Sequence, residues 1–398
     1  MKNRCRFLES ILWLWVTYIT SYLTYKMTTS DGVTFASDYL VHIKYSLAGK
    51  GYSLLSLIII LLYRISNSTL PIAVLIGVIV STTGVAIRKV LLYSIDVRVD
   101  KEVVNKNYNI ITFLSFALLF ISSLYIPEKT PFYLLTDEIG NLVRLEHTYI
   151  QSYLTQPWHN STYIAMRLFA MISIVVYIRI IRNVDIKIID FIAFFVSLVL
   201  SNMFKPNFIV AFAPSVFIFF IVAMIQKKDI KKYIILLAII VLSMCPLIYQ
   251  YKVLYTADND SGIVLTFSVI KELINGGYFK WMVLATYLFP TLVSILCIHE
   301  GLFDYIFGFA WVFEVVTFIQ KHFLLENGMR MLDGNWGWNM MFASLVLYVV
   351  CIGKLLSLRE MEDKQNNFYN LTWGILAIHI IYGFMYFGMI LRGGAYAI

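Results

Sequence analysis

The feature that most constrains this chain is a series of apolar runs, each long enough to cross a lipid bilayer. At 1.5 Å per residue, a helix of about 17–24 residues spans the roughly 30 Å of bilayer hydrocarbon. The sequence therefore predicts an all-α fold, a polytopic transmembrane helical bundle of about 11 spans. The apolar runs are residues 7–27, 70–87, 109–126, 163–181, 188–204, 208–225, 233–250, 279–298, 303–320, 338–357 and 368–391.

The composition excludes an ordinary soluble domain. Apolar residues make up 60% of the chain and charged residues 14%, against about 45–50% and about 25% in soluble proteins. No internal repeat or soluble domain interrupts the pattern, so residues 1–398 are expected to form a single integral membrane domain in contact with membrane lipids. The net charge of +8 comes from short basic clusters beside the apolar runs. Such clusters encode membrane topology, so no nucleic-acid partner is expected.

The basic clusters also set the predicted orientation. A twelfth apolar run, 52–63, is short and suits an interfacial helix within the first external loop. If it crossed the membrane, most later basic clusters would lie outside. We therefore expect a multi-pass protein of the inner (cytoplasmic) membrane with a cytoplasmic N-terminus and an external C-terminus. The external loops are then 28–69, 127–162, 251–278 and 321–337, and their size suggests chemistry or recognition on that side.

Two external segments carry candidate catalytic residues. Asp38 and His42 lie four positions apart and would share one face of a helix, where a carboxylate and an imidazole can act as base and partner. A solvated carboxylate and a surface histidine are the alternative. The second segment contains Trp158, His159 and Asn160, directly before a span. Trp158 suits an interfacial belt or a sugar contact, Asn160 is a plausible helix N-cap, and His159 has no evident structural role.

Cations near the outer face are candidates for phosphate binding. Arg167 lies inside the fourth span, where a charge is costly and needs a polar cavity, a partner or a snorkelling side chain. Lys205 precedes Pro206 in a tight external hairpin and either binds phosphate or snorkels. In the last external loop, Arg330 could clamp a phosphate. The same glycine-rich loop offers sugar or acceptor contacts, and they are Asp333, Asn335 and Trp336.

These residues gain weight because the predicted topology puts them all on one side. Ionisable residues in mid-span are scarce, and Glu314 is the main case. A proton-coupled transporter usually carries such residues near the bilayer midplane and often has inverted repeats. The sequence therefore favours an external site.

The architecture resembles the GT-C class of integral membrane glycosyltransferases. The shared features are an in-to-out first span, a long first external loop with an acid, a short amphipathic helix, and a second span ending in the basic pair Arg88-Lys89. Short elements around Asp38, His159, Lys205 and the Gly334-Asn335-Trp336-Gly337 run also resemble multispan proteins of bacterial surface-polysaccharide clusters. The resemblance implies that Asp38 is the base or the acceptor-positioning carboxylate.

The expected function is transfer of a sugar from a polyprenyl-phosphate-linked donor to a saccharide or lipid-linked acceptor at the outer face of the membrane. In this interpretation Asp38, His42 and His159 are catalytic, Lys205, Arg330 and Arg167 bind the donor phosphate, and Trp158, Asp333, Asn335 and Trp336 contact sugar or acceptor. An O-antigen or capsule repeat-unit polymerase is a close alternative. A transporter or flippase of lipid-linked saccharides is an alternative of another class. The cofactor stays unassigned, because the first loop lacks an Asp-Glu or Glu-x-Asp pair and a divalent metal is not indicated.

Overall fold

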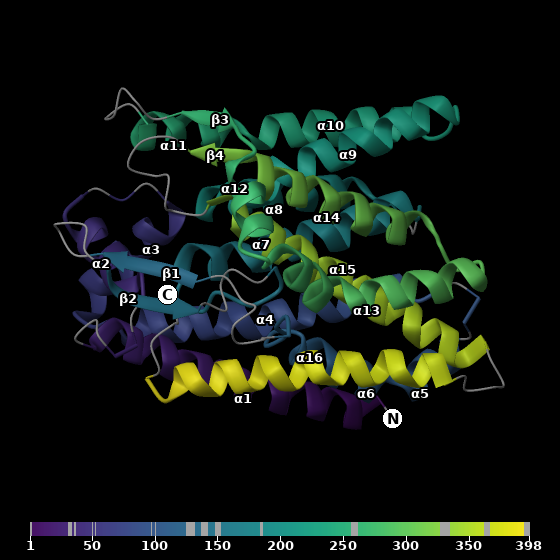
Figure 1. Cartoon of the computed structure of the whole chain (residues 1–398), viewed down its shortest axis with the longest axis horizontal. Helices are drawn as coiled ribbons and strands as arrows, with labels where there is room; N and C mark the ends of the chain where they lie inside the picture. Colours follow the sequence, from purple (N-terminus) through teal and green to yellow (C-terminus); the bar gives the residue numbers. More distant parts are fainter. Residues whose placement is uncertain are drawn as a thin grey trace.

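The chain forms an elongated bundle of helices that lie roughly along its longest axis (Figure 1). The computed structural model describes residues 2–30, 34–35, 37–49, 51, 53–96, 98–99, 101–124, 132–136, 142–147, 153–183, 186–255, 262–326, 335–361 and 367–393. The helices are α1 (Lys2–Thr29), α2 (Tyr39–Leu47), α3 (Leu54–Ser66), α4 (Leu70–Ser94), α5 (Lys101–Lys106), α6 (Tyr108–Ala117), α7 (Ser161–Ile181), α8 (Ile188–Phe204), α9 (Asn207–Ile225), α10 (Ile230–Ser243), α11 (Cys245–Tyr255), α12 (Ser268–Asn275), α13 (Phe279–His299), α14 (Tyr305–Phe323), α15 (Asn335–Met361) and α16 (Asn367–Leu391).

A multi-pass membrane protein is the class that these helices define. Within the described part of the chain, seven helical segments are long and apolar enough to cross a membrane. They are α4, α7, α9, Ile230–Gln250 (α10 with the start of α11), α13, Asn335–Arg359 of α15, and α16. The apolar helices α3, α6 and α8 are shorter, and the long helices α1 and α14 are not among the seven. All eleven predicted apolar runs therefore contain helix, while the count of about 11 spans is not confirmed.

The two ends of the bundle differ in character. One end holds α2, α3 and the small strands, and we call it the loop-rich end (left in Figure 1). At the other end α9 turns into α10, and α7 and α15 finish (right in Figure 1). We call it the basic end, because it holds Arg179, Arg182, Lys228 and Arg359, which come from separate basic clusters of the sequence.

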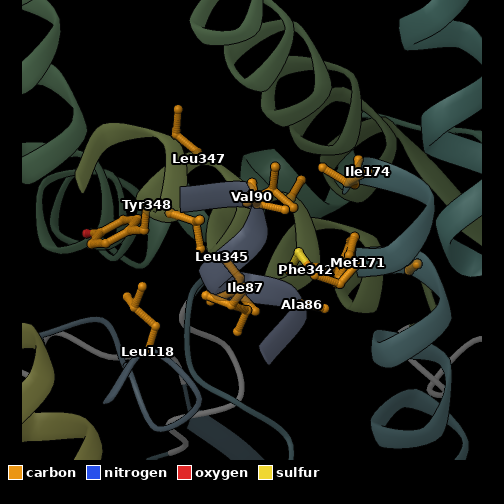
Figure 2. Packing of buried hydrophobic residues seen from close by; sticks show 14 of the residues in the cluster. Ala86, Ile87, Val90, Leu118, Met171, Ile174, Phe342, Leu345, Leu347 and Tyr348 are labelled. Carbon is orange, nitrogen blue, oxygen red and sulfur yellow. The ribbon is translucent and has the colours of Figure 1, made fainter. Parts of the chain in front are cut away.

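Helix α15 is the centre of the bundle. All of its apolar span is buried, whereas less than half of the span is buried in the outer helices α10, α13 and α16. Figure 2 shows its side chains Phe342 and Leu345 packed between α4 and α7, beside Ile87 and Met171. A helix that is apolar on every side can only be stable when it is surrounded by other apolar surface. In a membrane that surface can also be lipid, so the central position of α15 reflects its packing against the neighbouring helices and not its hydrophobicity alone.

Helix α6 ends earlier than the predicted span 109–126. The chain leaves the helix after Ala117 and continues through residues 118–124 as a turn and an extended segment that is buried almost throughout. Its backbone is satisfied by neighbouring helices: the Ser122 carbonyl accepts from His379 Nδ1 at 2.8 Å, and the Leu124 N–H donates to the Ala285 carbonyl at 3.4 Å. Non-helical backbone at membrane depth is tolerated where protein supplies such partners.

Two pairs of short antiparallel strands interrupt the otherwise helical fold, and the sequence pattern did not predict them. Strand β1 (Phe132–Thr136) pairs with β2 (Leu142–His147) inside the predicted loop 127–162. Strand β3 (Ile263–Leu265) pairs with β4 (Leu324–Glu326), which joins the predicted loops 251–278 and 321–337. Both strand pairs lie at the loop-rich end (Figure 1). The described parts of the segments expected to form the external loops therefore lie together at that end.

Candidate functional site

Asp38 and His42 form a close pair at the start of α2. Asp38 is the N-cap residue of this helix, and His42 is one turn further on. Their side chains therefore share one face, as the spacing predicts, with His42 Nε2 3.6 Å from Asp38 Oδ2. The carboxylate is partly exposed, at 27% of its side-chain area, so it remains accessible to a proton donor from outside.

A buried loop, residues 153–160, holds Asp38 against the start of α7. Asp38 Oδ1 accepts a hydrogen bond from the Ser161 N–H at 2.9 Å, and the Asp38 N–H donates to the His159 carbonyl at 3.2 Å. Ser161 is the first residue of α7, where N–H groups lack helical partners and the helix dipole favours negative charge. The carboxylate of one helix therefore caps another, which fixes both elements in relation to each other.

The charge state of Asp38 follows from its surroundings. Burial raises the pKa of the carboxyl, but the contact with His42 and the hydrogen bond from the Ser161 N–H outweigh burial and lower the pKa below its ordinary value. For His159, burial is the largest effect and lowers the pKa to about 4, with Lys205 acting in the same direction and Asp38 opposing. At neutral pH the site thus has an ionised carboxylate beside a neutral imidazole.

Lys205 lies on the other side of the same loop. Its Nζ donates to Asn160 Oδ1 at 3.3 Å and lies 5.2 Å from the ring centroid of Trp338. Asn160 is the N-cap of α7, and its Oδ1 also accepts from the Tyr163 N–H at 3.0 Å. The side chain thus contacts a polar group and an aromatic face. Residues 159–161 therefore contact both Asp38 and Lys205.

Arg167 is a buried cation without a counter-charge among the described residues. Its side chain is 1% exposed, and none of its three guanidinium nitrogens has a hydrogen-bond partner there. The neighbouring hydroxyl of Tyr163, one turn earlier on α7, is also buried without such a partner. Since arginine stays protonated and an unpaired buried charge is costly, this arrangement calls for an anion.

More buried polar atoms at this end lack hydrogen-bond partners within the described ranges. They come from the last turns of α8 and the first two turns of α15, close in sequence to Lys205 and Trp338. These atoms are Ser201 Oγ, Asn202 Oδ1, Trp336 Nε1 and Asn339 Oδ1. Native proteins satisfy nearly all such groups, so a cluster of exceptions at one end indicates a place for a polar ligand or water.

The remaining predicted contact residues have different outcomes. Trp158 is buried, stacked on Phe120 with ring centroids 5.5 Å apart and tilted against Phe387 at 4.8 Å. The ring is therefore packed among other aromatic rings inside the bundle and does not lie on its exposed surface. Asn335 donates to Glu326 Oε2 at 2.9 Å, and Trp336 is half-buried. Arg330 and Asp333 lie outside the described residues.

The structure adds residues that sequence patterns missed. Trp338 receives Lys205 on its ring and packs against His159, with centroids 5.7 Å apart. Lys321, at the end of α14, lies over the ring of Tyr153 at 4.3 Å and close to Gly337. A lysine in the last turn of a predicted span and a tryptophan in the first turn of the next are ordinary interfacial residues by pattern, so only the packing connects them with the loop 153–160.

No metal site emerges from the described ranges, where no group of three or more His, Cys, Asp or Glu could hold an ion. Comparisons of the chain with protein-family models, with curated proteins and with solved structures found no match in any of the three. The class of the protein is therefore set by its fold alone, as a helical multi-pass membrane protein.

Proposed function

We propose that this chain is a membrane glycosyltransferase that moves a sugar from a polyprenyl-phosphate-linked donor to a saccharide or lipid-linked acceptor, in the synthesis of cell-surface polysaccharide or glycoconjugate. The observation that carries the proposal is the arrangement around residues 159–161. An ionised carboxylate contacts this tripeptide from one side and a lysine from the other, while a buried arginine without a described counter-charge lies further along α7.

Asp38 would act as the general base. In the proposed reaction it accepts the proton of the acceptor hydroxyl while the acceptor oxygen forms a bond to the anomeric carbon. The bond from that carbon to the phosphate oxygen breaks, and the bonding electrons leave with the polyprenyl phosphate. A carboxylate whose pKa is kept low is ionised throughout the neutral range, and His42 supports the charged form from 3.6 Å. His159, neutral beside it, is available to position the acceptor.

Arg167 and Lys205 would stabilise the leaving phosphate. Arg167 lies seven residues beyond Asn160, which is about 10 Å along the helix axis. Because Lys205 contacts the N-cap residue of α7, the two cations lie at different depths along that helix, and the proposed donor phosphate would pass between them. Cations already in place cost no reorganisation as charge develops on the leaving group.

The finer topology belongs to the same proposal. About 11 spans, an inner-membrane location, a cytoplasmic N-terminus and an external C-terminus would put the loop-rich end outside. An odd number of crossings is supported by Figure 1, in which the start of α1 and the end of α16 lie at opposite ends of the bundle. The gathering of lysines and arginines at the basic end supports a cytoplasmic location for that end.

Replacement of Asp38 by Asn tests the proposal with little structural cost. The Asn carbonyl can still accept the Ser161 N–H, so the contact with α7 is kept while the charge and the basicity are lost. We expect transfer to fall by about 10²–10⁴-fold. The measurement is glycan transfer in membranes of a deletion strain that expresses the variant, with surface polysaccharide and lipid-linked intermediates read together.

A matched control is Glu272→Gln, an exposed carboxylate on α12 at the same end of the bundle. Transfer should be unchanged in this variant. If Asp38→Asn transfers the sugar at the wild-type rate, the assignment of Asp38 as the general base is refuted. If Asp38→Asn leaves glycan linkage intact in vitro but abolishes movement of the lipid-linked sugar across the membrane, the transferase proposal is refuted and a transporter is favoured. Accumulation of single repeat units would instead identify the transfer step as polymerisation.

A further inference from the structure

A cavity lies at the basic end, far along the bundle from the candidate site. It has a volume of about 530 Å³ and is formed where α4, α7 and α9 end and where α10 and α14 begin. Ligand pockets typically have volumes of about 300–1,000 Å³. The polar residues that line it include Tyr93, Arg182, Lys228, Asp229, Tyr233 and Asp304.

The carboxylates of this cavity are already neutralised. Asp304 Oδ2 accepts from Arg182 Nη2 at 3.1 Å and from Lys354 Nζ at 2.7 Å, while its Oδ1 caps α14 through the Phe307 N–H. Lys354 is fully buried, so its charge is held in place below the cavity. The Asp304 carboxylate thus pairs with both Arg182 and Lys354, and these three groups together carry a net charge of +1.

The other two carboxylates pair with one cation each. Asp96 Oδ1 lies 2.9 Å from Arg98 Nε, and Asp229 Oδ1 lies 3.4 Å from Lys232 Nζ. Lys228 is exposed at the cavity, and its side chain has no hydrogen-bond or ion-pair partner among the described residues. With five cations and three carboxylates, the cavity and its direct contacts carry a formal charge of +2. An anion is therefore the favoured occupant.

The cavity also lies beside exposed apolar side chains at the edge of the bundle, where a lipid headgroup could enter it. Ala223 and Gln226 of the α9 end line it, but their neighbours Met224 and Ile225 are exposed apolar residues, with Ile225 76% exposed. Exposed apolar side chains on a membrane helix face lipid. On the far wall, Tyr233 donates to the Tyr305 hydroxyl at 2.8 Å, which gives a polar aromatic lining.

We propose that this cavity binds a phosphate group, with Arg182 and Lys228 as its cationic contacts. The phosphate can be the headgroup of an anionic phospholipid whose acyl chains follow the exposed face of α9, or it can belong to a soluble phosphorylated molecule. Basic pockets between membrane helices on the cytoplasmic side are a known setting for anionic headgroups. The site is separate from the proposed glycosyl transfer and does not depend on it.

The test uses the full-length protein in nanodiscs, with two arms for the two sources. In the lipid arm, discs contain phosphatidylglycerol and phosphatidylcholine, and native mass spectrometry measures the phosphatidylglycerol retained by the released protein. In the soluble arm, discs contain phosphatidylcholine alone, and inorganic phosphate is added while the melting temperature is followed. Removal of one cationic contact should weaken binding about fivefold, because each is worth about 1 kcal/mol.

Lys228→Gln is the first variant, because its side chain is exposed and its loss leaves no buried charge. The second variant is the double substitution Arg182→Gln/Lys228→Gln. In this variant the Asp304 carboxylate keeps Lys354 as a partner, so the start of α14 stays capped. Lys106→Gln is the control, an exposed lysine at the same end that does not line the cavity.

Reduced phosphatidylglycerol retention in both variants, with the control unchanged, supports the site and assigns it to lipid. A phosphate-dependent shift that is lost in both variants supports the site and assigns it to a soluble ligand. Equal binding by the variants and the wild type overturns the proposal. An equal loss in Lys106→Gln also overturns it, because the effect would then come from general surface charge.

Discussion

Replacement of Arg167 by methionine is expected to make the ligand-free protein more stable while it weakens function. The guanidinium is 1% exposed, and the described residues offer it no hydrogen-bond partner. Methionine has a similar length and fills the same apolar surroundings without a charge. Exchange of buried ionic groups for well-packed apolar ones stabilises proteins by about 1–4 kcal/mol, and we expect a gain in this range. Since the proposed donor brings its own phosphate, the variant should also lose the stabilisation that a polyprenyl phosphate gives to the wild type.

Arg88 provides a matched control with the opposite sign. It is another buried arginine, on the neighbouring helix α4, but its Nη1 lies 2.7 Å from Glu9 Oε2 and its Nη2 donates to Glu9 Oε1 at 2.8 Å. Arg88→Met leaves that carboxylate unpaired and should destabilise the protein. Because Glu9 is 23% exposed, we expect a loss of about 1–3 kcal/mol, less than for a fully buried pair.

The assay is equilibrium unfolding of the two variants and the wild type in mixed micelles, with and without added polyprenyl phosphate. Opposite signs for the two substitutions without ligand are the expected result. A clear destabilisation by Arg167→Met without ligand would refute the reasoning, because the guanidinium would then have a counter-charge within the protein. Unchanged stabilisation by polyprenyl phosphate in this variant would remove Arg167 from the donor site.

Three further predictions concern the framework of the site. Burial lowers the pKa of His159 from 6.5 to about 4. Between these two pH values the histidine is protonated in the unfolded chain but not in the folded chain. Stability should therefore be complete above pH 6.5 and fall by up to about 3 kcal/mol towards pH 4, and His159→Asn should remove that part of the pH profile. Asn160→Ala removes the α7 cap and should cost about 1–2 kcal/mol in unfolding measurements, whereas Asn160→Asp should retain the cap. A methyl group on Gly383 would overlap the Phe120 carbonyl oxygen, so Gly383→Ala should destabilise by about 1–3 kcal/mol or more. Gly374→Ala, on the same helix with open space, should stabilise by about 0.5–1 kcal/mol, and equal effects at both glycines would contradict the close approach.

Local rules account for what the sequence predicted correctly. The eleven apolar runs all contain helix, because a long run of apolar residues in lipid must satisfy its backbone hydrogen bonds within itself. The four-residue spacing of Asp38 and His42 put both on one face of α2, and Asn160 caps α7 through the Tyr163 N–H. Each of these features depends on residues close together in the chain.

Other features of the site depended on packing between distant segments. Trp158 looked like an interfacial residue, but it is enclosed by Phe120 and Phe387, which lie about 40 residues before it and more than 200 residues after it. Lys205 finds Asn160 and Trp338, and the early end of α6 is possible only because α13 and α16 supply hydrogen-bond partners. No local pattern contains these contacts.

The sequence by itself determined that the chain is a helical membrane protein and which segments form its main helices. Only the tertiary structure decided which faces of those helices meet, that Arg167 lies buried without a described partner, and that a cationic cavity forms at the basic end. The physical reason is that lipid tails are as apolar as leucine. Hydrophobicity therefore brings a helix into the membrane without selecting its neighbours, and close packing and hydrogen bonds between helices make that selection.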